Sequence, residues 1–285
     1  IPGKGPHGEP LGDDNYGTQF QDHAVDGLAA EGIFNLVWEE IPGTYPDGKK
    51  YSLRKPIITF EQLNYGPLSE QIQMSPRVAP QMIGLGLLEA IDAQTLLSNA
   101  DEFDNNGDGI SGRANYVWNS IDQKQQIGRF GWKANEPSIL QQISGALNGD
   151  MGIISAHFNN QHILPNQVAA KKLPTGGDKE IDDDDLEKLH LYSATLAVPA
   201  QRNINNTGVQ AGKQIFMQLN CNACHIEKVV TGEHPKFSVL SNQTIRPYTD
   251  LLLHDMGAGL ADNRPDFLAT GNEWRTPPLW GIGLF

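Results

Sequence analysis

Two cysteines and one histidine form the clearest chemical signal in this 285-residue sequence. Cys221 and Cys224 are separated by two residues, they are the only cysteines, and His225 follows directly. Two thiols at this spacing can add to the two vinyl groups of a haem, which places the adjacent histidine beneath the iron as an axial ligand. The C-x-x-C-H pattern therefore predicts covalently attached haem c at Cys221, Cys224 and His225.

Two other interpretations of the cysteine pair remain open at this stage. The pair could act as a redox dithiol, or it could bind zinc together with His234 and His254. The sequence has no βαβ pattern around the motif and no second cysteine pair, which are the features that those two sites usually require. A disulfide framework is excluded, because only two cysteines are present.

A helix expected over residues 208–219, with Thr207 as its N-cap, leads into the motif. Gly212 and Phe216 lie one helical turn apart on it, and this order of helix and attachment turn resembles class I cytochrome c domains. Met256 is the predicted distal ligand of the iron, since a thioether opposite histidine raises the reduction potential. His254, a ligand outside this chain and an open site are the alternatives.

Arg246 and Arg275 lie in the region expected to surround the haem. The guanidinium fork matches a carboxylate, so we predict that these arginines bind the haem propionates. Ordinary surface or interdomain ion pairs are the alternative for each of them.

An acidic loop matches the first half of an EF-hand calcium loop. Asp104, Asn106 and Asp108 alternate along it, Gly109 allows a sharp turn, and the carbonyl of Ile110 offers a further oxygen. The bidentate glutamate of an EF-hand is missing, so we predict a single structural Ca²⁺ site at Asp104, Asn106, Asp108 and Ile110, completed by Asp101, Asn115 or water. An Asx-rich turn that closes without metal is the alternative.

Composition sets the outer limits of the fold. The net charge of −13 disfavours a nucleic-acid partner, and no run approaches the roughly 18 apolar residues of a membrane span. Strand pairs are expected over residues 33–41 with 51–60 and over 114–121 with 125–132. Helical periodicity follows Pro80 through Leu97, starts again after Pro137, and reappears after the aspartates 182–185, which we interpret as a solvated helix start.

These elements predict a mainly α fold with much irregular loop. We expect a loop-rich region with small β-hairpins, helices and the calcium-like loop over residues 1–200. A cytochrome c-like haem domain is expected over residues 201–285.

Several motifs together resemble the bacterial di-haem oxidoreductases, which are related to the di-haem cytochrome c peroxidases. They lie at residues 75–80, 82–91, 108–113, 128–133, 245–250, 254–257 and 274–281, and the resemblance extends over nearly the whole chain. It implies two c-type haems, a periplasmic or otherwise exported location, a small electron-donor protein, and peroxide or another small oxidant as substrate.

The chain departs from that family pattern in one respect, because it carries one C-x-x-C-H motif. The resemblance implies a second motif upstream of Ile1 and further sequence beyond Phe285. It also implies that the haem of this chain transfers electrons, and no catalytic residue is assigned. A non-catalytic electron-carrier module is the alternative function.

Overall fold

Most of the chain runs in loops in the computed structural model, which describes residues 1–283. Helices, namely five α-helices and three single 3-10 turns, make up 20% of these residues, and strands and isolated bridges of small antiparallel sheets make up about 19%. The prediction of a mainly α fold is therefore wrong. The 30 glycines and 18 prolines of the sequence interrupt regular secondary structure and favour turns over much of the backbone.

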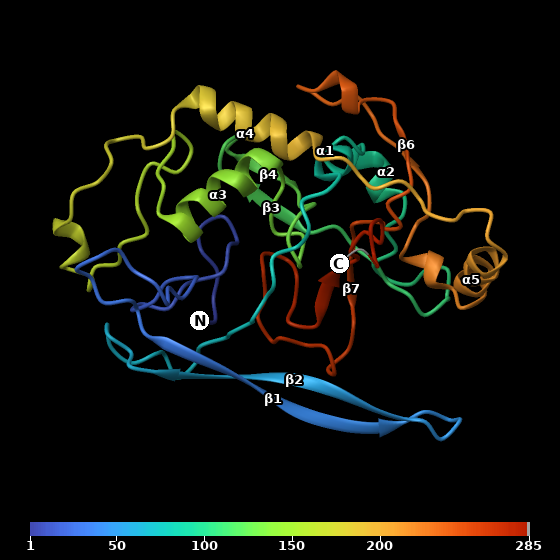
Figure 1. Ribbon diagram of the computed structural model, residues 1–285, viewed down its shortest axis with the longest axis horizontal. Coiled ribbons are helices and arrows are strands. Elements are labelled where there is room, and N and C mark those ends of the chain that lie inside the picture. Colours follow the sequence, from blue (N-terminus) through green and yellow to red (C-terminus); the bar gives the residue numbers. More distant parts are fainter. Residues whose placement is uncertain (284–285) are drawn as a thin grey trace. The chain divides into compact units, whose positions relative to one another are not determined.

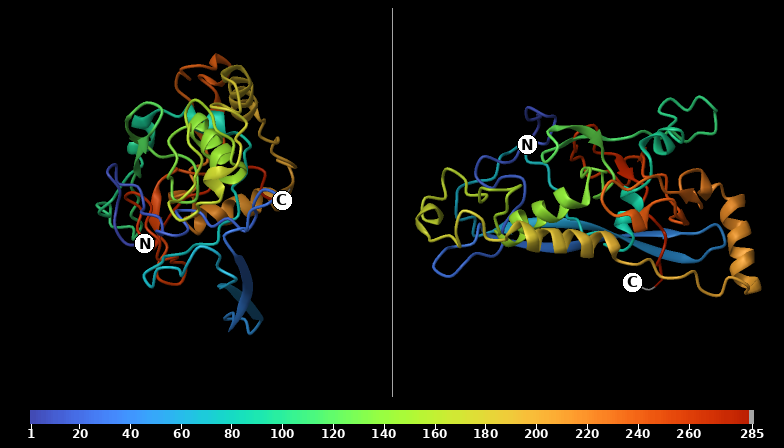
Figure 2. Two further views of the ribbon diagram at one scale, coloured as in Figure 1. Left: turned by 90° about the vertical axis from the view of Figure 1, so that its left-hand side faces the viewer. Right: turned by 90° about the horizontal axis from the view of Figure 1, so that it is seen from above.

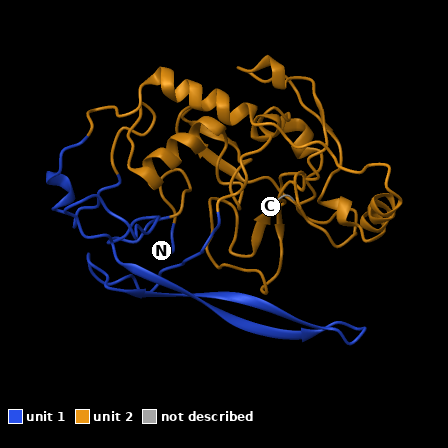
Figure 3. Ribbon diagram, in the orientation of Figure 1, with its two compact units in different colours: residues 1–3, 11–78, 162–175 blue, residues 4–10, 79–161, 176–285 orange. Residues whose placement is uncertain are grey.

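The described chain divides into two compact units (Figure 3). Unit 1 comprises residues 1–3, 11–78 and 162–175, and unit 2 comprises residues 4–10, 79–161 and those from 176 onward. The C-x-x-C-H motif and the acidic loop both belong to unit 2. The expected boundary near residue 200, between a loop-rich region and a haem domain, stays a prediction.

Unit 1 contains one long antiparallel hairpin, drawn in blue in Figure 1. β1 (Ile33–Thr44) pairs with β2 (Lys50–Glu61), and Trp38 lies opposite Pro56 near the middle of the ribbon. The predicted strand pair is thus confirmed, with both strands longer than expected. Gly48 closes the connecting loop at a φ of 86°, a conformation that glycine adopts without steric cost.

Unit 2 contains the helices. α1 (Leu85–Glu89), α2 (Ala93–Leu97), α3 (Ile139–Met151) and α4 (Asp183–Thr195) precede α5 (Thr207–Gln218), which leads into the C-x-x-C-H motif. α3 and α4 lie side by side, whereas α5 lies at one end of the unit, away from both of them (Figures 1 and 2).

Local capping explains where several of these helices begin. The Ser138 side chain accepts from the backbone N–H of Gln141, and the Asp182 side chain accepts from that of Asp185 at 2.7 Å. The aspartate run is therefore a helix start, as predicted. The predicted helix through residue 97 is instead divided into α1 and α2, because Asp92 adopts an extended backbone conformation between them.

The core of unit 2 joins these helices to the loops that follow them. The buried apolar side chains come from α1 to α4, from the β-hairpins, and from the segments after residue 228; the largest fully buried ones are Leu88, Ile91, Ile139, Leu251 and Leu252. Their burial supplies the main driving force for folding. The loop after residue 247 is thereby part of the core, although it contains little regular structure.

The remaining sheets of unit 2 are two-stranded and short. They are β3 (Tyr116–Asn119) with β4 (Lys124–Ile127), β5 (Val229–Val230) with β6 (Thr244–Ile245), and β7 (Leu253–Asp255) with β8 (Glu273–Arg275). The first of these confirms the second predicted strand pair in shortened form. Within residues 1–283, none of the helices has the length and hydrophobicity needed to cross a membrane.

Candidate haem site

The attachment motif follows directly after α5. The helix ends at Gln218, and Asn220 turns the chain at a φ of 58°, a left-handed conformation that asparagine tolerates better than most residues. A single 3-10 turn, Cys221–Ala223, then brings the two thiols to the same turn of chain. The helix begins one residue earlier than expected, because Asn206 and not Thr207 caps it by accepting from the N–H of Gly208.

His225 is held in place through one of its two ring nitrogens. Its Nδ1 lies 2.8 Å from the carbonyl oxygen of Tyr248, so the proton on Nδ1 donates to that carbonyl. The proton then stays on Nδ1, and Nε2 keeps a free lone pair for a metal. The Phe216 ring packs near both residues, with ring centroids 6.2 Å from His225 and 5.9 Å from Tyr248.

The loop that supplies this carbonyl is buried and has an unusual backbone. Tyr248 and Leu251 have φ values of 54° and 60°, which are rare for bulky residues and cost free energy. Hydrogen bonds compensate for that cost, because Thr249 Oγ1 donates to the carbonyl of Thr276 at 2.6 Å and accepts from the N–H of Leu251. The position of the Tyr248 carbonyl is thus fixed by tertiary contacts.

A buried acid–histidine pair lies beside the second cysteine. His254 Nε2 is 2.8 Å from Asp250 Oδ2, and His254 Nδ1 is 2.8 Å from the carbonyl of Ser111 and 3.6 Å from Cys224 Sγ. Burial opposes a charge on His254, but the hydrogen bond with Asp250 and the contact with Cys224 outweigh it and raise its pKa to about 10. Both nitrogens are engaged, so His254 offers no free lone pair to iron.

Within residues 1–283, one group of three His, Cys, Asp or Glu side chains has its ligand atoms close enough to share a metal ion. This group is Cys224, Asp250 and His254. His234 is not part of this group, since its Nε2 lies 3.1 Å from Glu89 Oε2. The Cys₂His₂ zinc site that would use both histidines is therefore not assembled.

The surroundings of the motif fit a large apolar group. No residue of α5 is buried, although its sequence is amphipathic, and Leu219, directly before the motif, is 70% exposed. Ile215 and Met217 are also exposed at the end of the helix. Uncovered apolar side chains beside two free thiols and an oriented imidazole are the features that a covalently attached haem needs.

The two arginines predicted to bind propionates occupy different environments. Arg246 is half exposed, with its Nε 3.8 Å from Glu227 Oε1, which is the surface ion pair considered above. Arg275 is buried, and its Nε donates to the carbonyl of Gly131 at 2.8 Å. Met256 is 50% exposed just after β7. Its role as distal ligand stays a prediction.

The acidic loop closes on itself through Asx-type hydrogen bonds. The Asp104 carboxylate accepts a hydrogen bond from the backbone N–H of Gly109. Asn106 Oδ1 accepts one from the N–H of Asp108, and Asp108 Oδ1 accepts one from the N–H of Ile110; all these bonds are 2.8–3.2 Å long. Asp101 likewise accepts from the N–H groups of residues 105 and 106. Asn115 cannot complete a site here, because its side chain is bonded to the backbone of Lys133, Asp266 and Leu268.

A family model described as "Di-haem oxidoreductase, putative peroxidase" matches residues 11–285. These residues are nearly the whole chain, so the chain belongs to this family, and the predicted resemblance is confirmed. Membership supports haem binding and oxidoreductase chemistry at the level of the family. The chain matches no curated protein and no solved structure.

Proposed function

We propose that this chain is the electron-transfer part of an exported haem c oxidoreductase. The haem would be attached through Cys221 and Cys224, with Nε2 of His225 as the proximal iron ligand. The observation that carries the proposal is the hydrogen bond from His225 Nδ1 to the Tyr248 carbonyl, which fixes the tautomer that ligates iron. Thioether attachment also supports an exported, periplasmic location.

The iron of such a haem would take up and release single electrons, and the protein residues would set its position and potential. The thioether bonds would fix the haem beside α5, where Ile215 and Leu219 would cover its apolar surface. Hydrogen bonding of His225 to a carbonyl makes the imidazole a stronger donor, which favours the oxidised iron. The Asp250–His254 pair would add a charged group next to the Cys224 thioether.

In the complete protein we propose that a small redox protein donates electrons to this haem and that peroxide is finally reduced. The family description supports the peroxidase reaction. A non-catalytic electron carrier is the second candidate, because a haem at this C-x-x-C-H motif can transfer electrons without a catalytic residue nearby. Steady-state kinetics separate the two, since only the peroxidase oxidises a reduced donor in response to hydrogen peroxide.

A pyridine haemochrome spectrum of the protein expressed with export and haem attachment tests the cofactor. We expect a c-type α band in the wild type and its loss in a Cys221→Ser, Cys224→Ser double variant. His225→Ala should keep the attached haem and change the visible absorption spectrum of the native protein, recorded without pyridine. A wild-type spectrum without the c-type band would contradict the proposal and favour the alternative of a redox dithiol at Cys221 and Cys224.

We also propose that the acidic loop binds Ca²⁺ through Asp104, Asn106, Asp108 and the carbonyl of Ile110. Carboxylate and amide oxygens suit Ca²⁺, and each oxygen that accepts an N–H keeps a second lone pair. Gly107 and Gly109 already adopt the positive φ values, 73° and 81°, that a tight loop requires. The site would be structural, because it closes a loop within unit 2.

A further inference from the structure

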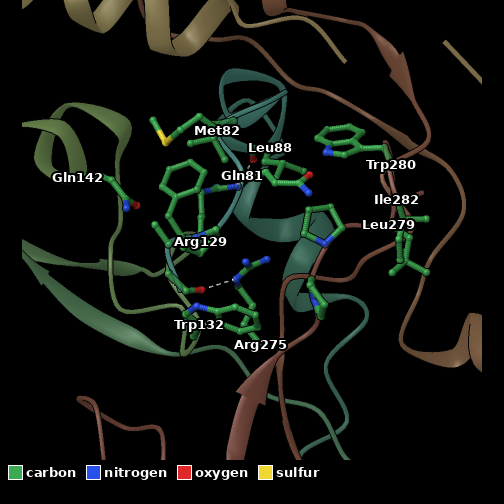
Figure 4. Close-up of a pocket in the computed structure, with 17 residues that line it drawn as sticks. Gln81, Met82, Leu88, Arg129, Trp132, Gln142, Arg275, Leu279, Trp280 and Ile282 are labelled. Atoms are coloured by element: carbon green, nitrogen blue, oxygen red, sulfur yellow. Dashed lines mark hydrogen bonds between the residues drawn. The ribbon is translucent and has the colours of Figure 1, made fainter. Parts of the chain in front are cut away.

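Unit 2 contains a cavity of about 260 Å³ that neither α5 nor the C-x-x-C-H motif lines. It lies between the segment that includes α1, the turn at residues 129–132, and the segment after β8 (Figure 4). Its walls are mostly apolar, with Leu88, Phe130, Trp132 and Trp280 among them. No acidic side chain lines it.

Two arginines contribute the only charges in the cavity wall. Arg129 Nη1 donates to the carbonyl of Leu88 at 2.9 Å, and Arg275 donates to the carbonyls of Gly131 and Thr276 at 2.8 and 3.1 Å. Within residues 1–283, no carboxylate lies within 4.0 Å of either guanidinium. Figure 4 shows both side chains among the residues that surround the cavity.

The electrostatic consequence is that two cations are poorly compensated at one place. Burial lowers the pKa of each arginine to about 10. More distant carboxylates offset part of this shift, those of Glu89 and Asp92 for Arg129 and that of Asp250 for Arg275. Both therefore stay charged at neutral pH. A buried charge without a partner is costly, and an anion placed between the two would remove that cost.

A third polar group faces the same cavity. Gln142 lines it, and Gln142 Oε1 is buried without a hydrogen-bond partner. A buried acceptor without a donor is uncommon in folded proteins. The aromatic rings nearby offer flat apolar surfaces, so the cavity combines two donors for an anion, one open acceptor and walls suited to a planar body.

We propose that this cavity binds the carboxylate of a ligand with a flat apolar body, clamped between Arg129 and Arg275. The guanidinium fork matches a carboxylate with two parallel hydrogen bonds, and the apolar walls select against a fully hydrated inorganic anion. The carboxylate can come from a free aromatic acid or from the propionate of a haem. Only the second source rests on the function proposed above.

Isothermal titration calorimetry on the haem-loaded protein tests the free acid, with benzoate as the probe and benzyl alcohol as its neutral match. We expect benzoate to bind at least about tenfold more tightly than benzyl alcohol, and Arg129→Met to remove this preference. Arg202→Gln, at an exposed arginine outside the cavity, is the matched control and should behave like the wild type. Equal binding of the two probes, or phosphate binding as tightly as benzoate, would overturn the proposal.

A spectroscopic redox titration distinguishes the second source. If a propionate occupies the clamp, benzoate does not bind, and Arg129→Met lowers the midpoint potential of a haem because a cation beside it is lost. Arg202→Gln should leave the potential unchanged. A protein that neither binds benzoate nor changes its potential in Arg129→Met contradicts the proposal. The comparison of benzoate with benzyl alcohol needs only the wild type, so it still tests the free-acid source if the variant does not fold.

Discussion

The carboxyl group of Glu136 gives a quantitative test of the packing next to the cavity. Its Oε2 accepts a hydrogen bond from Gln141 Nε2 at 3.0 Å, and its backbone carbonyl accepts from the N–H groups of residues 129 and 130. Burial raises the pKa of Glu136 from 4.5 to about 7. The hydrogen bond from Gln141 opposes this increase, and the negative charge of Asp266 adds to it.

The sign of the effect follows from proton binding. Between pH 4.5 and 7 the folded protein holds a proton that the unfolded chain has lost, so the free energy of unfolding falls as pH rises through this range. The contribution is fully present below pH 4.5 and lost above pH 7. The pKa difference of 7 minus 4.5, or 2.5, corresponds to at most about 3.5 kcal/mol at roughly 1.4 kcal/mol per pH unit.

Urea unfolding followed by circular dichroism at about pH 4.5 and about pH 8 measures this contribution. Glu136→Gln keeps the acceptor for Gln141 but cannot ionise. We expect its free energy of unfolding to match that of the wild type at the lower pH and to exceed it by up to about 3.5 kcal/mol at the higher pH. Glu70→Gln, at an exposed carboxylate, is the control. If Glu136→Gln changed stability with pH as steeply as the wild type, the reasoning from burial would be refuted.

Three further predictions concern stability in unit 2. Lys133 is fully buried, and its Nζ lies 3.0 Å from Asp262 Oδ1 and 2.7 Å from the Thr270 carbonyl oxygen. Lys133→Met should therefore lower the free energy of unfolding in urea by about 3–5 kcal/mol. A decrease below about 1 kcal/mol would contradict a buried ion pair. A Cβ at Gly128 would lie 1.7 Å from the Ala134 carbonyl oxygen, so Gly128→Ala should lower the melting temperature, and an unchanged value would show that the turn yields freely. Excess EDTA should also lower the melting temperature if the loop at residues 104–110 binds Ca²⁺, and added Ca²⁺ should restore it. No response to either would exclude a structural ion.

Local sequence signals were sufficient for several elements. The β1–β2 hairpin was predictable because apolar and β-branched residues flank a loop rich in proline and glycine. The starts of α3 and α4 followed from Pro137 and from the aspartates near Asp182, since capping depends on residues adjacent in sequence. The same reasoning placed the cap of α5 one residue too late, because Thr207 and Asn206 are both competent caps.

The tertiary parts of the site were not predictable in this way. The motif identified His225, but nothing near it in sequence indicated the Tyr248 carbonyl, which is presented by a loop held through Thr249 and Thr276. Arg129 was missed for the same reason, since only folding places it in the wall of the same cavity as Arg275. The fold class failed because most of the chain, which is rich in glycine and proline, lies in loops, and the helix expected through residue 97 is divided at Asp92.

The long hairpin of unit 1 has a practical consequence for anyone who handles the protein. A ribbon of two strands has an open edge on each side, and here large apolar side chains are exposed on both faces, Trp38 on one and Val37 and Leu53 on the other. Open edges of this kind template pairing between molecules, so this segment is where aggregation at high concentration should start. The pairs Glu39 with Lys55 and Glu40 with Arg54 place charges across the ribbon, and charged side chains on open strands generally oppose such association.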